Sequence, residues 1–354
     1  MDSYYREYEF SLSSILSFVW RGIVVGCVSG IVVSLFRLLI GFISAKVVNY
    51  YELSHEQPSL LILILGMTLF IVVAIGFLIK SDSDIKGSGI PHVEGELKGL
   101  LHPDWWSVLW KKFVGGVLAI SMGFMLGREG PSIQLGAMAG KGVAQSLKAE
   151  RMEKRVLIAS GAAAGLSAAF NAPIAGLLFV IEEIYHQFSR LVWITALVAS
   201  LVANFISLNI FGLTPVLDMP GDLAVLPLKH YWILLLLGAF LGVMGYIYEK
   251  TTLKATIIYD FLGKVFHISN YFYGIFAAIL ILPIGYFLSA IARWWKWLDY
   301  FIIDKSPDSY DCFHILYHSL CVEYVELLKW TSWWDFSSYF DFGSTFRLWF
   351  WNIF

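Results

Sequence analysis

The sequence predicts an all-α protein that crosses a membrane several times, with broken and re-entrant helices. Three observations predict this class. The 354 residues are 58% hydrophobic and 15% charged, whereas soluble domains carry about 25% charged residues. Apolar runs follow one another along residues 15–288. The breaks between them contain glycine, proline and charged side chains, which suits helices that stop inside the bilayer.

Eight apolar segments are candidate spans or parts of spans. Several are shorter than the roughly 20 residues that a simple span needs, whereas the first is long enough to cross at a steep tilt. These uneven lengths favour helices that stop partway. Residues 1–14 are a polar N-terminal segment with both charge signs, which is not typical of a cleavable signal. The segments are Ile15–Ala45, Leu60–Ile79, Leu109–Leu126, Val156–Phe170, Ile174–Ile184, Leu191–Leu213, Tyr231–Ile247 and Tyr271–Ile291.

The most informative break is the pentapeptide Gly127–Pro131, which places Arg128 and Glu129 inside membrane-type sequence. Charged groups at membrane depth cost several kcal/mol unless they face a polar cavity or each other. Pro131 suits the first turn of a helix, and helix N-termini bind anions. We therefore expect a loop followed by a helix start, where the Glu129 carboxylate acts as a tethered anion that competes with a free one.

A second break, Gly87–Pro91, has the same pattern. Ser88 offers a hydroxyl, the flanking glycines leave backbone N–H groups accessible, and Pro91 again suits a helix start. Two interrupted segments that point their N-termini inward are typical of a transporter's ion site. For either motif alone, an ordinary surface loop between two helices is the alternative.

A third segment, Ser160–Phe188, begins with small residues that allow membrane helices to approach closely. Asn171–Pro173 marks the end of one helix and the start of another. Glu182 and Glu183 close an otherwise apolar helix. Because neighbours on a helix point about 100° apart, we expect one carboxylate to face water and the other the protein. We assign Glu182 to the solvated position; a buried carboxylate has a raised pKa, as a proton path requires.

These three motifs, in this order, resemble the CLC family of chloride channels and chloride/proton exchangers over about Ile15 to Leu288. The resemblance implies that Ser88 binds the central chloride with the amides around Gly89 and Ile90. It implies that Glu129 is the gating glutamate that also transfers protons, and that Glu183 is the internal proton-transfer glutamate. The other motif positions would be scaffold: Gly87, Pro91, Gly127, Arg128, Gly130 and Pro131.

The same resemblance implies the substrates and the assembly. Ser88 and Pro131 favour chloride over the fluoride-exporting branch, and Glu183 favours an exchanger over a passive voltage- or pH-gated channel, which is the alternative. The partners would be chloride, protons and the lipid bilayer of the cell membrane, with a homodimer at full length. Helices near Ile174–Ile184 and Leu191–Leu213 would form part of the dimer contact. The net charge of −2 argues against nucleic acid as a partner.

A membrane enzyme with a metal cluster is a more remote alternative. Its ligands would be Glu182, Glu183, His92 and His186. His92 is far from the others in sequence, and no ligand spacing such as H-E-x-x-H occurs. The three cysteines form no metal-binding or disulfide pattern. We therefore expect no enzyme activity, no metal and no cofactor.

The composition changes abruptly after Leu288. Eight of the fourteen tryptophans lie between Arg293 and Phe354, among charged and polar residues. An aromatic-rich interfacial tail is one interpretation. Tryptophan has the single codon TGG, so a shift of one base turns most tryptophan codons into glycine codons. Applied to Trp330–Ser338, the shift can encode Gly-Leu-Pro-Gly-Gly-Ile-Phe-Leu-Pro, which resembles the Gly-x-Phe-x-Pro helix start of the second CLC half.

We therefore expect residues 15–288 to be an incomplete CLC-type transmembrane domain, consisting of the first inverted repeat and the start of the second. Residues 289–354 would be an out-of-frame tail. The change of frame would lie between Leu288 and Arg293, and a premature stop would follow Phe354. Because half a pore leaves broken helix ends without partners, we expect the 354-residue chain not to transport.

Overall fold

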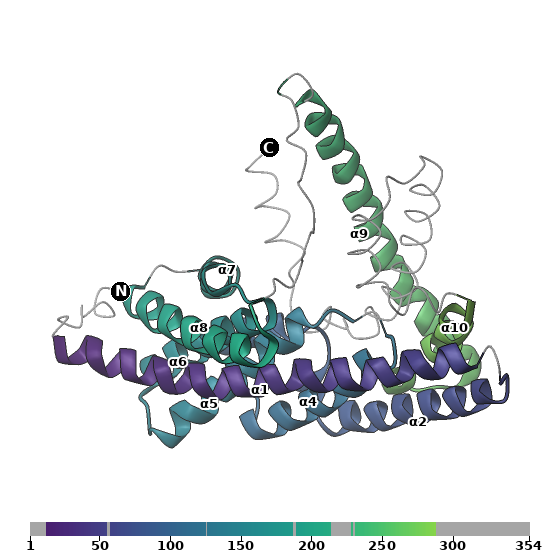
Figure 1. The fold of residues 1–354 in the computed structure, drawn as a ribbon, viewed down its shortest axis with the longest axis horizontal. Coiled ribbons are helices and arrows are strands. Elements are labelled where there is room, and N and C mark those ends of the chain that lie inside the picture. Colours follow the sequence, from purple (N-terminus) through teal and green to yellow (C-terminus); the bar gives the residue numbers. More distant parts are fainter. Residues whose placement is uncertain are drawn as a thin grey trace. The chain divides into compact units, whose positions relative to one another are not determined.

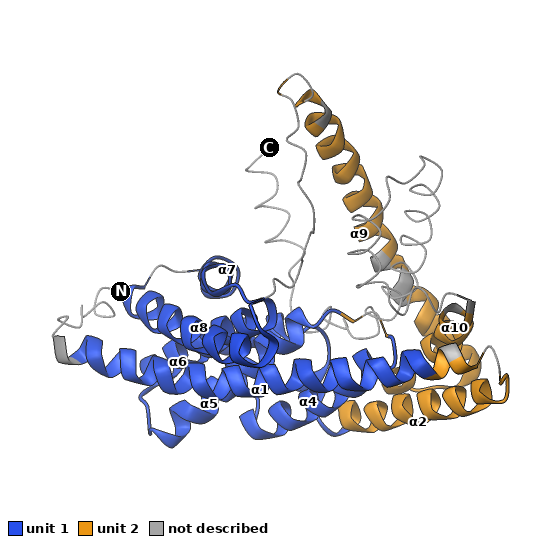
Figure 2. Ribbon diagram, in the orientation of Figure 1, with its two compact units in different colours: residues 1–49, 81–123, 127–218 blue, residues 50–80, 124–126, 219–354 orange. Residues whose placement is uncertain are grey.

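The computed structural model describes residues 12–54, 57–124, 126–186, 189–213, 228 and 231–287 (Figure 1). Across these ranges the chain forms helices joined by short loops, without a strand, so the predicted all-α class is confirmed. The chain divides into two compact units (Figure 2). Unit 1 comprises residues 1–49, 81–123 and 127–218, and unit 2 the remainder. The tail predicted at 289–354 lies outside the described residues.

Unit 1 contains both Gly/Pro breaks and most of the helices. Helix α1 begins here and its last residues belong to unit 2. The elements of unit 1 are α1 (Leu12–Leu53), η1 (Ser83–Ile85), α3 (Ile90–Leu97), α4 (Trp105–Ser121), α5 (Glu129–Ser146), α6 (Arg151–Phe170), α7 (Pro173–Phe179), η2 (Val180–Tyr185) and α8 (Arg190–Phe211).

The core of unit 1 is the antiparallel pair α5 and α6, whose backbones touch through glycines. A Cβ placed on Gly136 would lie 2.9 Å from the Gly165 Cα, and one placed on Gly161 would lie 3.1 Å from the Gly140 Cα. Small residues four apart on both helices permit this approach, as in other membrane helix pairs. The contact buries most of α5 and α6 and fixes the α5 start beside the α6 end.

A second close contact joins α1 to α8, which run parallel. Three glycines of α1, spaced four apart, face three small residues of α8 with the same spacing. A Cβ on the middle glycine, Gly26, would lie 2.9 Å from the Val202 Cβ and 3.0 Å from the Ala199 Cα. The pairs are Gly22 with Thr195, Gly26 with Ala199, and Gly30 with Ala203. Figure 1 shows the two helices side by side.

The helix boundaries in unit 1 lie where the sequence places its breaks. Helix α3 begins with Pro91 in its first turn and Gly89 as its N-cap. Helix α6 ends at Asn171, which has the left-handed φ of 57° that suits a C-cap. Helix α7 then begins at Pro173. The stop and start predicted at Asn171–Pro173 are both present.

Unit 2 contains α2 (Leu60–Ser81), α9 (Trp232–Phe266), η4 (Asn270–Phe272) and α10 (Gly274–Phe287). Aromatic rings hold these helices together. Phe77 and Phe272 have ring centroids 5.3 Å apart, and Tyr259 stacks on Tyr273 at 6.1 Å. A Cβ on Gly285 would lie 2.7 Å from the Tyr51 Cζ, so this glycine permits a close contact.

The protein is a membrane protein. Four of the described helices contain stretches long and apolar enough to cross a membrane, or five if a bent pair in unit 2 counts as one span. The four stretches are Ser14–Tyr51, Leu60–Ser81, Arg190–Phe211 and Leu234–Thr251. Each of the eight apolar segments contains a helix, although the segment Leu109–Leu126 continues past the end of α4 at Ser121. Residues 125 and 288–291 lie outside the described ranges. Helix α9, at 35 residues, is much longer than its segment Tyr231–Ile247.

Candidate functional site

The two breaks that the sequence singled out meet in unit 1. A Cβ placed on Gly130, at the start of α5, would lie 2.9 Å from the carbonyl carbon of Ser88 and 2.9 Å from the Ser88 Cβ. Ser88 immediately precedes the N-cap of α3. Only a residue without a side chain permits two helix starts to approach so closely. The structure therefore brings Gly87–Pro91 and Gly127–Pro131 together.

The backbone before α3 depends on its glycines. Gly87 and Gly89 have φ values of 75° and 94°, in the region that side chains rarely adopt. Between them, Ser88 is 6% exposed. Its hydroxyl oxygen accepts a hydrogen bond from the Ile90 backbone N–H at 3.4 Å. The first N–H groups of α3 have no partner within the helix, so this end suits an anion.

Glu129 is the first residue of α5, and Arg128 is its N-cap. The Glu129 carboxylate folds back against Gly127, where a Cβ would collide with it. It therefore lies at the positive end of the α5 dipole, which stabilises a negative charge. Arg128 packs its guanidinium over the Phe170 ring, 5.9 Å from the centroid.

Lys112 of α4 holds the segment that precedes α3. Its side chain is 2% exposed, and its ammonium donates to the carbonyl oxygens of Ile85, at 2.9 Å, and Gly87, at 2.5 Å. Both acceptors are neutral backbone groups, so the positive charge extends toward the α3 start. The sequence alone could have indicated Lys112 as a site residue. It is a lysine within an apolar run, and charged residues in membrane segments usually have a functional role.

Gln134, one turn into α5, ties the same segment from the other side. It is fully buried, and its Nε2 donates to the Asp84 carbonyl oxygen at 2.8 Å. Its Oε1 lies against Gly89, where a Cβ would be 2.5 Å away. Burial, and next the charge of Asp82, raise the pKa of the Asp84 carboxyl. These contacts fix the loop before α3 on both sides.

This arrangement of groups is suited to an anion. Two helix starts lie against each other, a buried serine hydroxyl lies at one of them, and an ammonium group lies behind the loop. The Glu129 carboxylate is tethered at the second helix start. A free anion and this carboxylate would therefore favour the same positive region.

Glu182 and Glu183 lie on η2, a short π-helix that continues α7. Val180 and Ile184 are buried and anchor the segment, whereas both glutamates are exposed. The inward position expected for Glu183 is therefore absent from this structure. A π-helix closes its hydrogen bonds from i to i+5, so neighbours are separated by a smaller rotation than on an α-helix. The proton-transfer role of Glu183 stays a prediction.

The end of η2 is held to α3 by a contact that no local sequence pattern indicates. His186 Nε2 lies 3.3 Å from the Glu94 Oε1, and Lys98 Nζ lies 2.5 Å from the same oxygen. Glu94 is one turn beyond Ile90 on α3. This contact connects the segment that contains Glu183 with the helix whose other end holds Ser88. Nothing local in the sequence pairs two residues 92 positions apart.

The metal-cluster alternative finds no geometric support where the chain is described. Within those ranges no group of three or more His, Cys, Asp or Glu side chains is arranged to hold a metal ion. His186 has Glu94 as its neighbour. Of the four proposed ligands, Glu182 and Glu183 are exposed on η2, and His92 lies in the first turn of α3.

Comparison with known proteins identifies a family model and several similar proteins. Residues 71–307 match the family model described as voltage gated chloride channel. This range extends past the predicted change of frame. The chain is 36% identical over 243 residues to the H(+)/Cl(−) exchange transporter ClcA of Vibrio vulnificus (strain YJ016), covering 67% of this chain and 52% of that protein. The chain thus spans about half the length of the curated relatives it matches.

Solved structures agree on the fold. A slow cyanobacterial Cl−/H+ antiporter is similar with a TM-score of 0.76 and 26% identity, over 89% of this chain and 73% of that one. A CLC-type fluoride/proton antiporter is similar with a TM-score of 0.71 and 21% identity, over 92% of this chain and 78% of that one. The second likeness concerns the fold alone.

Proposed function

This chain belongs to the voltage gated chloride channel family, and from that premise we propose that it serves chloride transport coupled to proton antiport across the cell membrane. It is a transporter and not an enzyme. The single observation that carries the proposal is the contact between the two helix starts, in which Gly130 of α5 lies against Ser88 before α3. This contact puts an anion site and a titratable carboxylate within one small region.

Chloride binds at the start of α3. The Ser88 hydroxyl and the backbone N–H groups of Gly89 and Ile90 donate to it, because the first N–H groups of a helix have no partner within the helix. The long bond of 3.4 Å from the Ile90 N–H to the Ser88 hydroxyl oxygen is replaced when chloride binds. Lys112 adds positive potential from behind the loop through its contacts with the carbonyls of Ile85 and Gly87.

Glu129 is the gate. When ionised, its carboxylate occupies the positive region at the α5 start and competes with chloride. When protonated, it loses this attraction and moves away, which admits chloride and delivers a proton. Glu183 transfers the proton to the other side of the membrane. What supports this role is the His186–Glu94 contact, which holds the segment η2, with Glu183, against α3.

The whole transporter needs more than the part described. The matched region covers only 52% of the curated relative, and half of a pore leaves helix ends without polar partners. We therefore propose that the 354-residue chain does not transport, that restoring the reading frame near Leu288 recovers transport, and that the restored protein is a homodimer. Resequencing the DNA around that codon is the first check.

The decisive experiment uses the frame-restored protein in liposomes, with chloride and proton fluxes measured together. We expect coupled exchange. Glu129→Gln mimics the protonated carboxylate, so chloride flux should persist, lose its pH dependence and no longer move protons. A matched control is Glu153→Gln, which removes a carboxylate that pairs with Arg21 at the far end of α6.

These flux measurements distinguish a coupled exchanger from a passive channel. Chloride current without proton movement in the unmodified protein would favour the passive channel. Proton uptake that survives Glu129→Gln would contradict the gating assignment. Coupled flux through the unrepaired 354-residue chain would refute both the change of frame and the need for a second half.

A further inference from the structure

Two connections that are distant in the sequence meet at one end of unit 1: the loop between α3 and α4, and the turn between α5 and α6. The Lys141 ammonium donates to the Pro103 carbonyl oxygen at 2.5 Å. A Cβ placed on Gly99 would lie 3.7 Å from the Arg151 Nη2. The two connections therefore form one surface. We call this surface, made of residues 98–106 and 141–155, the basic end.

The basic end carries positive charges that the protein does not pair. Lys148 and Arg151 are exposed, and their side chains make no ion pair or hydrogen bond in the described part of the chain. The two acids beside them have other partners. Glu153 pairs with Arg21 of α1 at 2.7 Å, and the Glu150 side chain caps the start of α6. Two positive charges are thus available to a group outside the chain.

Exposed apolar side chains accompany these charges. Trp106 lies in the first turn of α4, and Trp106, Trp110 and Val114 are exposed at intervals of four residues, so they form one stripe along the helix. Leu147 and Met152, which flank the turn between α5 and α6, are also exposed. Basic side chains next to exposed apolar ones are typical of the boundary between acyl chains and headgroups in a bilayer.

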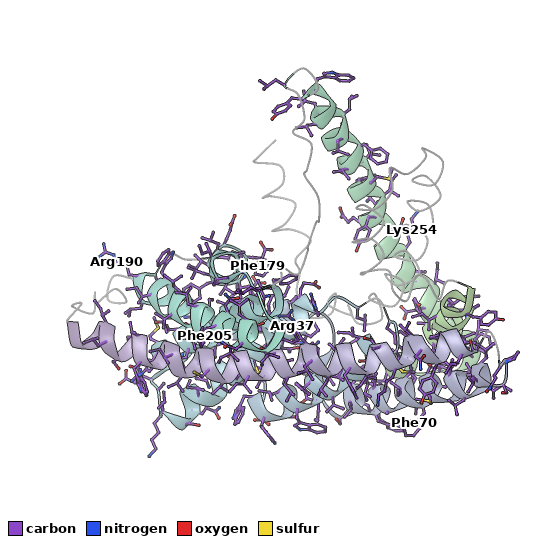
Figure 3. The ribbon with its side chains drawn as sticks, in the orientation of Figure 1. Arg37, Phe70, Phe179, Arg190, Phe205 and Lys254 are labelled. Carbon is purple, nitrogen blue, oxygen red and sulfur yellow. The ribbon has the colours of Figure 1, made fainter. Side chains whose placement is uncertain are left out.

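The distribution of basic residues indicates the side of the membrane. Residues 141–155 contain five Lys and Arg, whereas residues 122–128 and 171–172, which join helices toward the other end of unit 1, contain only Arg128. Arg190, at the start of α8, also lies at the basic end, and Phe205 lies farther along the same helix (Figure 3). Cytoplasmic connections are rich in Lys and Arg, and the cytoplasmic leaflet contains anionic lipids.

We propose that the basic end binds an anionic phospholipid of the cytoplasmic leaflet. Lys148 and Arg151 attract its phosphate group by charge, and Trp106, Leu147 and Met152 contact its acyl chains. A zwitterionic lipid binds less tightly because its headgroup has no net charge. This surface is separate from the chloride site, since it begins beyond the end of α3, whereas Ser88 precedes the start of that helix. The proposal goes beyond the proposed function and does not depend on it.

Lipid binding can be measured by native mass spectrometry of the 354-residue chain in an uncharged detergent. Phosphatidylglycerol and phosphatidylcholine with the same oleoyl chains compete for the protein, so their ratio reports the headgroup alone. One basic residue near a membrane surface changes the affinity for anionic lipid about fivefold. Lys148→Asn and Arg151→Gln should each reduce the preference for phosphatidylglycerol about fivefold, and the double variant about twenty-fivefold. Added salt should reduce it as well.

The variants are chosen to preserve the fold. Lys148 has a φ of 50°, a conformation that asparagine tolerates well. The control Lys46→Gln removes an exposed lysine from the far part of α1 and should leave the preference unchanged. Trp106→Ala should weaken the binding of both lipids alike, because an apolar contact does not distinguish headgroups. Glycerol phosphate, which lacks acyl chains, should not displace the lipid.

Three results would overturn the proposal. They are equal binding of both lipids by the unmodified chain, a folded double variant that keeps the full preference, and a loss in Lys46→Gln as large as that in the double variant. The last result would mean that the attraction is spread over the whole protein. Circular dichroism checks folding, and if Arg151→Gln does not fold, Lys148→Asn alone decides. None of these measurements involves transport, so they test the lipid site separately from the proposed function.

Discussion

Replacement of Gly130 by alanine tests whether the two helix starts meet. The new Cβ would lie 2.9 Å from both the carbonyl carbon and the Cβ of Ser88. Because the obstacle includes backbone, the start of α3 or of α5 must move. Such overpacking costs about 1–3 kcal/mol. Alanine also gains up to about 1 kcal/mol over glycine in helix propensity, so Gly130→Ala alone would understate the contact.

A matched control removes the propensity contribution. Gly41 lies in α1, and a Cβ there meets no described atom within 4 Å. Gly41→Ala therefore gains the helix propensity without the collision. The difference in unfolding free energy between the two variants isolates the contact, and we expect Gly130→Ala to be less stable by about 1–3 kcal/mol. The assay is equilibrium unfolding of the chain in micelles, followed by circular dichroism.

Chloride binding gives an independent readout. If α3 moves to make room for the methyl group, Ser88 and the N–H groups beside it move too, and chloride affinity should fall in Gly130→Ala but not in Gly41→Ala. Equal stability of the two variants, within about 0.5 kcal/mol, would mean that the helix starts do not touch. The reasoning that joins Ser88 to Glu129 would then fail.

Two further predictions concern the helix contacts and the proton path. Gly136→Ala and Gly161→Ala should each destabilise the chain by about 1–3 kcal/mol; because they face each other, the double variant should cost less than their sum, and additive losses would contradict the contact. In the frame-restored protein, Glu183→Gln should abolish proton transport and leave chloride movement, whereas Glu182→Gln should have a milder effect. Exchanged phenotypes would mean that the assignment of the two carboxylates is wrong by one residue.

Local chemistry explains why the helix breaks were predictable. Proline at positions 91 and 131 suits the first turn of a helix, and the positive φ values of Gly87 and Gly89 need glycine. These constraints act within a few residues of the chain. The end of α6 at Asn171 follows from the same kind of signal, because asparagine tolerates the left-handed conformation of a C-cap.

Other features could not be predicted because they depend on distant partners. The sequence shows Lys112 as a cation in an apolar run. It does not show that the carbonyl oxygens of Ile85 and Gly87 accept its hydrogen bonds, because tertiary packing brings these groups together. The orientation of Glu183 was predicted from α-helical rotation, whereas the segment is a π-helix. Helix α9 continues beyond the end of the predicted segment at Ile247. Its surface is exposed there, so charged side chains can be part of the helix.

The last prediction concerns Glu96 of α3 and Lys141 of α5, a buried ion pair whose side chains are 5% and 4% exposed. Lys141 also donates to the Pro103 carbonyl oxygen at 2.5 Å. Removal of one member of a buried pair leaves an uncompensated charge and costs about 3–5 kcal/mol, whereas replacement of both by apolar residues is often neutral. Lys141→Met should therefore destabilise the chain strongly.

The double variant Glu96→Leu/Lys141→Met should recover most of that loss in the same unfolding assay, apart from the hydrogen bond to Pro103. The pair lies at the opposite end of α3 from Ser88, and α3 spans only Ile90–Leu97. A short helix held at both ends keeps its N-terminus in place, so chloride affinity should fall in Lys141→Met and return in the double variant. A double variant that is stable but does not bind chloride would contradict this purely structural role. It would mean that the charges of Glu96 and Lys141 act directly on the anion.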